Sequence, residues 1–130
     1  MAGGKTTRRK GHNFEREVAI MFRPYFPDAK RQLEYQEGLG YDIQGTGDLS
    51  IQCKVGKSFK IEKALKEAEQ PNKIPVAITK KDREDIVVSM YWKDFEFFLI
   101  SYLDNKDKIY VRPPVKKKPK APAVEKPSIN

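Results

Sequence analysis

The most constraining feature of this sequence is a pair of alternating segments joined by two glycines. From residue 50 to residue 55, polar and apolar side chains alternate, and Gln52 and Lys54 share the polar face. A period of two is typical of a strand with one buried face. A shorter upstream run alternates in the same way, and Gly45-Thr46-Gly47 between the runs has turn chemistry. We therefore predict a β-hairpin that carries Asp42 on one arm and Gln52 with Lys54 on the other.

Length and composition limit the class of protein. A chain of 130 residues with 38% hydrophobic content suits one domain with a real core. The sequence contains no apolar run near the ~20 residues needed to cross a bilayer and no apolar segment of a secretory signal. The single cysteine, Cys53, excludes an internal disulfide, and with the single histidine, His12, it cannot fill a zinc site. We expect a cytoplasmic protein without a membrane partner, in which Cys53 is a small core residue.

The net charge of +8 is concentrated at the two ends of the chain. Residues 1–12 carry +4 and residues 104–130 carry +5, whereas residues 13–103 sum to −1. A nearly neutral body with basic ends is typical of a protein that binds a polyanion such as nucleic acid. A soluble protein with solvated lysine-rich ends would show the same distribution.

Periodicity predicts one folded domain between two irregular basic ends. We expect a flexible arm over residues 1–12, a domain over 13–112 and a disordered tail rich in proline and lysine over 113–130. The expected elements are a helix over 13–23 capped by Asn13, strands near 29–36, 41–44 and 50–55, a helix over 58–69 capped by Ser58, strands at 74–79 and 85–90, a helix that starts at Asp94, and a short edge strand at 109–111.

Each predicted helix has an apolar face that we expect to be buried. The expected faces are Phe14, Val18, Met21 and Phe22 in the first helix, Ile61, Ala64, Leu65 and Ala68 in the second, and Phe95, Phe98, Leu99 and Tyr102 in the third. The aromatic row of the last helix is more typical of core packing than of a surface that stacks on bases.

Asp42 followed by Gln52-x-Lys54 resembles the signature of the PD-(D/E)XK nuclease superfamily, in which an Asp on one strand precedes a Glu-x-Lys or Gln-x-Lys on the next. Residues 9–18, Arg-Lys-Gly-His-Asn-Phe-Glu-Arg-Glu-Val, resemble the first helix of archaeal and phage-type Holliday-junction resolvases. In that helix the first Glu of Glu-Arg-Glu serves the active site, and Glu15 takes its place here. The resemblance implies a mixed α/β, restriction-endonuclease-like fold, with an αβββαβ core and helices that flank the sheet.

The resemblance also implies a site that contains Mg²⁺ or Mn²⁺, with Glu15, Asp42, Gln52 and Lys54 as catalytic residues. The carboxylate of Asp42, the side-chain oxygen of Gln52 and the backbone carbonyl of Cys53 would bind the cation. Glu15 would complete the acidic cluster directly or through a metal-bound water. Lys54 would polarise the attacking water or stabilise the charge that develops at the phosphate.

Two points in this site remain open in the sequence. Most resolvases of this type have Glu where this chain has Gln52, whereas Gln occurs in the Mrr-like nucleases, so the site is one negative charge short. The nearby Asp48 could compensate, or it could simply end the hairpin turn. Helical spacing places both Glu15 and Glu17 at a border of the apolar face and does not choose between them.

The implied activity is a metal-dependent DNA endonuclease, in the first place a resolvase that cuts branched DNA as a homodimer. A restriction-type or nicking nuclease on duplex DNA and a non-catalytic DNA-binding protein of the same fold are the alternatives. The residues expected to contact DNA are Arg8, Arg9, Lys10, His12 and Lys57. The resemblance is compatible with a cellular or a phage origin.

Overall fold

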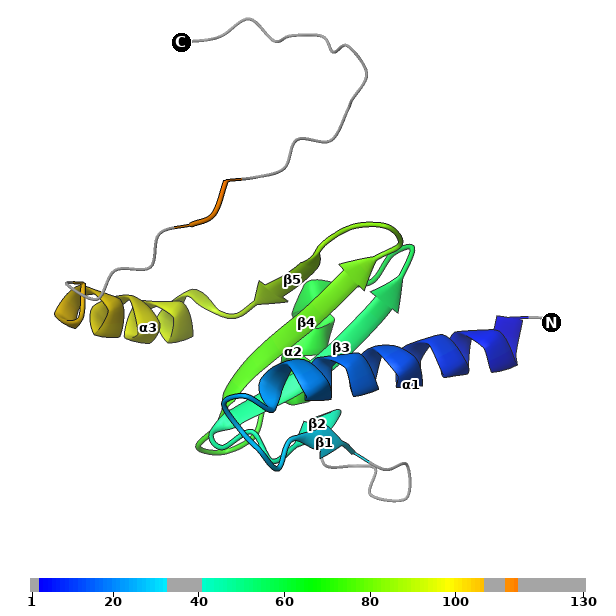
Figure 1. Cartoon of the computed structure of the whole chain (residues 1–130), viewed down its shortest axis with the longest axis horizontal. Helices are drawn as coiled ribbons and strands as arrows, with labels where there is room; N and C mark the ends of the chain where they lie inside the picture. The colour runs from blue at the N-terminus through cyan, green and yellow to red at the C-terminus, as the bar shows by residue number, and fades with distance from the viewer. Residues whose placement is uncertain (1–2, 33–40, 107–111, 115–130) are drawn as a thin grey trace, which may run out of the picture.

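The computed structural model describes residues 3–32, 41–106 and 112–114, and within these ranges the fold is mixed α/β (Figure 1). The elements are α1 (Gly3–Phe22), β1 (Lys30–Arg31), β2 (Ile43–Gln44), β3 (Leu49–Gly56), α2 (Ile61–Ala68), β4 (Ile74–Lys81), β5 (Ile86–Ser89) and α3 (Trp92–Asp104). Over the described residues, this order of helices and strands is the order predicted from the sequence.

The strands form one mixed five-stranded sheet in the order β1-β2-β3-β4-β5. Strand β2 is antiparallel to both of its neighbours, β1 and β3, and β5 is antiparallel to β4. Strands β3 and β4 are parallel over their whole length, from Leu49↔Ile74 to Gly56↔Lys81. Helix α2 is the crossover that parallel neighbours require. The predicted mixed sheet is confirmed.

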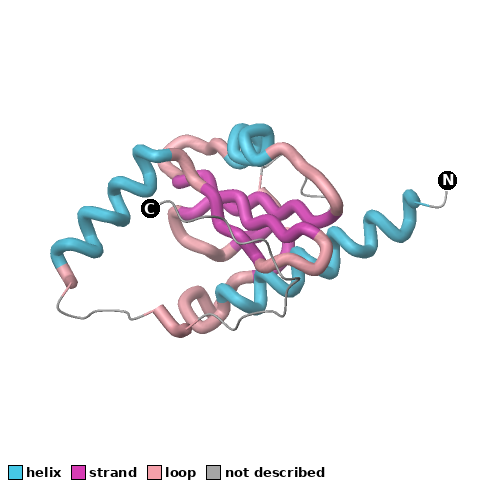
Figure 2. The backbone as a smooth tube through the Cα atoms, turned by 90° about the horizontal axis from the view of Figure 1, so that it is seen from above, coloured by secondary structure: helices cyan, strands magenta, loops and turns pink. Residues whose placement is uncertain are grey.

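Two helices cover opposite faces of the sheet (Figure 2). Helix α1 contacts β1, β2 and β3, and helix α2 contacts β3 and β4. The larger core lies under α1, where Val18 packs with Ile43 and Ile51, and the smaller one lies under α2, where Leu65 packs with Ala77. The predicted inward face of α2 is confirmed, because Ala64, Leu65 and Ala68 are buried and Ile61 packs against them.

The alternation in β3 divides its side chains between these two layers. Ile51 and Cys53 belong to the core under α1. Gln52 is paired with Ala77, which packs under α2, so Gln52 faces the opposite side of the sheet. Gln52 is only 8% exposed. The polar face of β3 is therefore covered by α2, rather than open to solvent.

Helix α1 begins at Gly3, so the prediction of a flexible arm over residues 1–12 is wrong from residue 3 onward. The segment contains no proline and several good helix formers, which lets the helix continue upstream. Asn13 does not cap the helix, because its side chain accepts a hydrogen bond from Arg16 (2.9 Å) within it. Phe14 and Val18 are buried as predicted, but Met21 is 45% exposed and Ala19 takes its place in the core.

The predicted caps of the other two helices are also wrong. Helix α2 starts at Ile61 after Lys60, so Ser58 lies outside it. Helix α3 starts at Trp92 after Tyr91, so Asp94 lies in its first turn. An acid in the first turn still interacts favourably with the helix dipole.

Helix α3 extends away from the sheet, and its predicted role in the core is wrong (Figure 1). Within Trp92–Asp104, all of which the structure describes, no residue is buried. Phe95, Phe98 and Tyr102 are 45%, 39% and 52% exposed. The two faces of the sheet are already covered by α1 and α2, so the aromatic row of α3 has no core to enter.

Some predictions lie outside the described residues: the end of the first strand, the edge strand at 109–111 and the tail from residue 115. None of the helices in the described ranges combines the length and the apolar composition needed to cross a lipid bilayer.

Replacing two of the glycines by alanine should change the free energy of unfolding in opposite directions. Gly45 has a φ of +82°, and a Cβ there would lie 2.4 Å from the Asp28 carbonyl oxygen, whereas a Cβ on Gly11 in α1 would meet nothing within 4 Å. We expect Gly45→Ala to lower the free energy of unfolding by more than ~1 kcal/mol and Gly11→Ala to raise it by ~0.5–1 kcal/mol. Urea denaturation measures both, and changes of the same sign would contradict this account of the hairpin turn.

Candidate active site

The hairpin places Asp42 against the strand that carries Gln52 and Lys54. The backbone N–H of Asp42 donates to the Ile51 carbonyl (2.7 Å). In return, the backbone N–H of Cys53 donates to Oδ2 of Asp42 (2.8 Å). Because Cys53 lies between Gln52 and Lys54 in β3, this second bond holds the carboxylate beside both residues. The hairpin thus brings the Asp42 carboxylate to the part of β3 that carries Gln52 and Lys54.

Glu15, in the middle of α1, lies near enough to Asp42 for the two charges to interact, but on the side of the sheet opposite to the one that Gln52 and Lys54 face. Its Oε1 accepts a hydrogen bond from Nε of Arg31 in β1 (2.9 Å), and both side chains are less than a fifth exposed, at 17% and 14%. Glu17 is exposed on another side of the helix. Of the two acids that helical spacing left open, Glu15 is the one that lies near Asp42.

Burial and mutual repulsion act on the two acids together. Burial, and to a smaller extent the charge of Asp42, raises the pKa of Glu15 to about 7 against the opposing effect of Arg31. Burial likewise raises the pKa of Asp42, against the Cys53 N–H and the Lys54 charge, and Glu67 adds to the increase. Burial is therefore the main reason that both acids bind protons more readily than usual, and Arg31 and Lys54 offset part of this effect.

Two charged residues of the site were not singled out from the sequence. Nζ of Lys54 lies 3.2 Å from Oε1 of Glu67, which reaches it from α2. Arg31 holds Glu15 across a sequence separation of 16 residues. Neither residue belongs to a spacing motif, because both pairs depend on how helices pack onto the sheet.

Cys53 contributes to the site through its backbone. Burial raises the pKa of its thiol well above the ordinary value, and the nearby acids Asp42 and Glu15 act in the same direction. The thiol therefore stays protonated near neutral pH and packs in the core, as expected. Metal coordination by the carbonyl oxygen of Cys53 stays a prediction.

Three further polar residues lie on the strands and the turn next to Asp42: Asp48, Gln32 and Gln44. Asp48 is in the hairpin turn, where its carbonyl accepts from the Ile74 N–H (2.8 Å). The turn follows β2, whereas Asp42 lies just before β2, so the two acids are at opposite ends of this strand. Asp48 therefore ends the turn and does not complete the acidic cluster. The amide of Gln44 donates to Gln32, whose N–H donates to the Asp42 carbonyl (2.7 Å).

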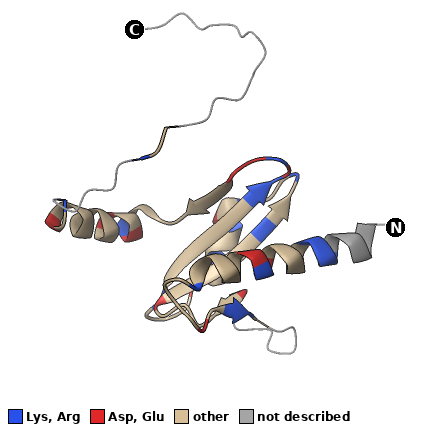
Figure 3. Ribbon diagram, viewed as in Figure 1, with Lys and Arg blue, Asp and Glu red and all other residues tan. Residues whose placement is uncertain are grey.

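Basic residues gather at the carboxyl ends of β3 and β4 (Figure 3). Nζ of Lys10 lies 2.7 Å from Oδ1 of Asp82 in the β4–β5 turn. That hydrogen bond, with the charges of Lys57 and Lys80, lowers the pKa of Asp82. We call this group the basic cluster; its members are Lys10, Lys57, Lys80, Lys81 and Arg83, and the acids Asp82 and Glu84 lie among them.

The basic cluster joins two of the residues that the sequence predicts to contact DNA. Lys10 and Lys57 belong to it, whereas Lys80, Lys81 and Arg83 were not singled out, because only the parallel pairing of β3 with β4 brings them together. Arg8 and Arg9 are exposed on α1, and His12 is half-buried. Lys57 follows Lys54 by three residues, so the basic cluster borders the candidate site.

The donor chemistry of the site fits a hard divalent cation. Asp42 and Glu15 offer carboxylate oxygens, Gln52 an amide oxygen and Cys53 a backbone carbonyl, which are the ligand types that Mg²⁺ and Mn²⁺ take. Within the described ranges, no three His, Cys, Asp or Glu side chains are grouped as a ready-made metal site. Glu15 and Glu67 instead pair with basic side chains, and Asp42 bonds to a backbone N–H.

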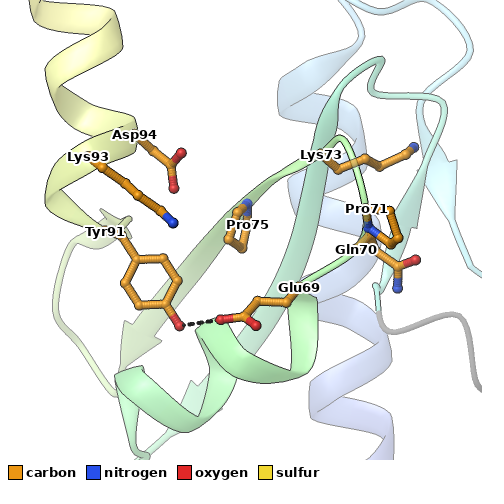
Figure 4. Close-up of a pocket in the computed structure, with 8 residues that line it drawn as sticks. All are labelled: Glu69, Gln70, Pro71, Lys73, Pro75, Tyr91, Lys93 and Asp94. Atoms are coloured by element: carbon orange, nitrogen blue, oxygen red, sulfur yellow. Dashed lines mark hydrogen bonds between the residues drawn. The ribbon is translucent and has the colours of Figure 1, made fainter.

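A separate hollow of about 470 Å³ lies between the end of α2, the start of β4 and the start of α3 (Figure 4). The hydroxyl of Tyr91 donates to Glu69 at its edge (2.8 Å). Lys73, Lys93 and Asp94 also line it, so acidic and basic groups are mixed. The hollow includes none of the predicted site residues.

Comparisons with models of protein families, with curated proteins and with solved structures find no significant match to this chain.

We expect Glu15 to make the stability of the metal-free protein fall between about pH 5 and pH 7. In the unfolded chain Glu15 ionises near its ordinary pKa of 4.5, whereas in the folded protein it keeps its proton up to about pH 7. The folded state therefore binds more protons in this interval, and its advantage is lost as the pH rises. Glu15→Gln should remove this part of the slope, while the exposed control Glu17→Gln should keep it.

Urea denaturation in EDTA at a series of pH values gives the slope for each protein. Equal slopes for the wild type and Glu15→Gln would contradict the raised pKa.

Proposed function

We propose that this protein is a metal-dependent DNA endonuclease of the PD-(D/E)XK type, with a restriction-endonuclease-like fold. The observation that carries the proposal is the hydrogen bond from the Cys53 N–H to Asp42, which holds the acid beside Gln52 and Lys54. The order of elements, αβββαβ, and the parallel pairing of β3 with β4 support the fold assignment.

Each residue of the site has a distinct part in hydrolysis of a phosphodiester. A Mg²⁺ or Mn²⁺ ion, when bound, would neutralise charge on the phosphate and lower the pKa of a water molecule. Asp42, the amide oxygen of Gln52 and the carbonyl of Cys53 would hold it, with Glu15 nearby. Lys54 would orient the attacking water, or it would donate a hydrogen bond to the phosphate oxygen on which negative charge increases in the transition state.

The basic cluster is the surface that we expect to bind the DNA backbone. Contacts between lysine or arginine and phosphates supply most non-specific affinity for DNA. Because the cluster borders Lys54, a duplex arm that lies on it would present its phosphates to the site. Two symmetric cuts, as in a four-way junction, would need two such sites.

The activity is tested with a four-way junction and a sequence-matched linear duplex, each in Mg²⁺, Mn²⁺ and EDTA. We expect metal-dependent cutting, with the junction cut faster. Cutting of the duplex alone would favour the restriction-type or nicking alternative. Binding without cutting in either metal would favour the non-catalytic DNA-binding alternative.

We expect Lys54→Ala to reduce the rate of cleavage at least ~100-fold, since a positioned proton donor contributes about 10²–10⁴-fold. The pair with Glu67 is about one-third exposed, so its loss should leave the fold intact. DNA affinity should remain close to that of the wild type, because the basic cluster is unchanged. The matched control is Lys66→Ala, an exposed lysine of α2. Wild-type cleavage by Lys54→Ala would contradict the assigned site.

The predicted homodimer has a candidate interface on α3. A helix that is apolar on most of its sides is usually buried in an assembly. Trp92, Phe98 and Leu103 are 64%, 39% and 52% exposed along its length. Antiparallel pairing with α3 of a second copy about a twofold axis would place Lys93 near Asp104 of the other copy, so charge as well as apolar contact favours this occupant. A twofold interface uses one patch on both subunits.

We expect Phe98→Asp to convert the dimer to monomers, because it would bury two unpaired carboxylates at the centre of the interface. The substitution should not unfold the domain, since no residue of α3 is buried. Tyr25→Asp, at an aromatic residue that is 76% exposed outside α3, is the control. Sedimentation equilibrium measures the mass, and a monomeric wild type would rule out this interface.

A further inference from the structure

Helix α2 directs one acid toward the candidate site. Its inward residues Ala64, Leu65 and Ala68 pack on the sheet. Glu67 lies between the inward residues and solvent, and its side chain is 37% exposed. Its Oε1 lies 3.2 Å from Nζ of Lys54, which stands on the polar face of β3 that α2 covers.

The other two acids of this segment lie in different surroundings. Glu62, in the first turn of α2, is exposed, and Glu69, just after the helix, accepts a hydrogen bond from Tyr91. Only Glu67 of these three is paired with a residue of the site. Its charge also contributes to the raised pKa of Asp42, so the two carboxylates interact across the site.

The site needs a further negative charge for a physical reason. Gln52 provides a neutral amide oxygen, so β3 itself brings no carboxylate to a divalent cation. Carboxylates dominate the binding of hard divalent cations, and affinity rises with the number of charged ligands. Glu67 is the acid that the helix layer places beside the same strand.

We infer that Glu67 supplies from α2 the carboxylate that Gln52 does not supply from β3, and that it belongs to the cation site with Asp42. This inference rests on the proposed function. In the structure the carboxylate is held by Lys54. A cation and the Lys54 amine would therefore compete for Glu67, so binding of the cation would leave the amine available to the water or the phosphate.

The test is Mn²⁺ binding to the full chain without DNA, measured by isothermal titration calorimetry. We expect Glu67→Gln to weaken binding at least about tenfold, the lower end of the effect of removing a partner that supports a metal site. Glu62→Gln removes the same charge from the same helix and should change the affinity less than about twofold, as expected for an exposed charge farther from the site. The double variant Gln52→Glu/Glu67→Gln moves the carboxylate onto β3 and should recover most of the wild-type affinity.

The outcomes separate this inference from the proposed function. If the wild type binds no Mn²⁺, the metal-dependent nuclease is itself wrong. If the wild type binds Mn²⁺ and Glu67→Gln binds it equally well, only the assignment of Glu67 fails, and a slower cleavage by that variant would then reduce its role to holding Lys54. Thermal melts in EDTA check that each variant is folded.

Discussion

The hydrogen bond from the Cys53 N–H to the Asp42 carboxylate is the contact on which the site depends. It joins an acid that precedes the two-residue strand β2 to the long central strand β3. Since Gln52 and Lys54 flank Cys53, one bond sets the position of the acid relative to both. A neighbouring backbone hydrogen bond, from the Asp42 N–H to the Ile51 carbonyl, fixes the register between the Asp42 segment and β3.

Placing several acids around this bond has an energetic consequence. Half-buried carboxylates lose hydration, and like charges close together oppose ionisation, which raises the pKa of Glu15 and Asp42. Arg31 and Lys54 offset part of this cost from two different strands. A site that is unfavourable when empty of cations binds a divalent cation more tightly, because the cation relieves the repulsion.

The sequence predicted the hairpin, the order of elements, the alternation of β3 and the inward face of α2, because a period of two or of 3.6 depends on local burial. The expectation that β3 has only one buried face is wrong, because Ser50 and Gln52 on its polar face are buried under α2. The sequence did not predict that α1 begins at Gly3 or that α3 stands away from the sheet. Apolar residues at the spacing of Phe95 and Phe98 occur both in helices that pack on their own domain and in helices whose apolar face is exposed, so the spacing could not distinguish the two. Arg31, Glu67 and three members of the basic cluster were missed because their partners are set by tertiary packing alone.

The central claim is that the Asp42 carboxylate is a ligand in a divalent-cation site beside Lys54. A crystal soaked in Mn²⁺ tests it directly through anomalous scattering. The account predicts an anomalous peak in contact with Asp42 and the Cys53 carbonyl, with the side-chain oxygen of Gln52 turned toward it. A well-ordered site at saturating Mn²⁺ with no peak at Asp42, or with peaks only elsewhere on the surface, would contradict it.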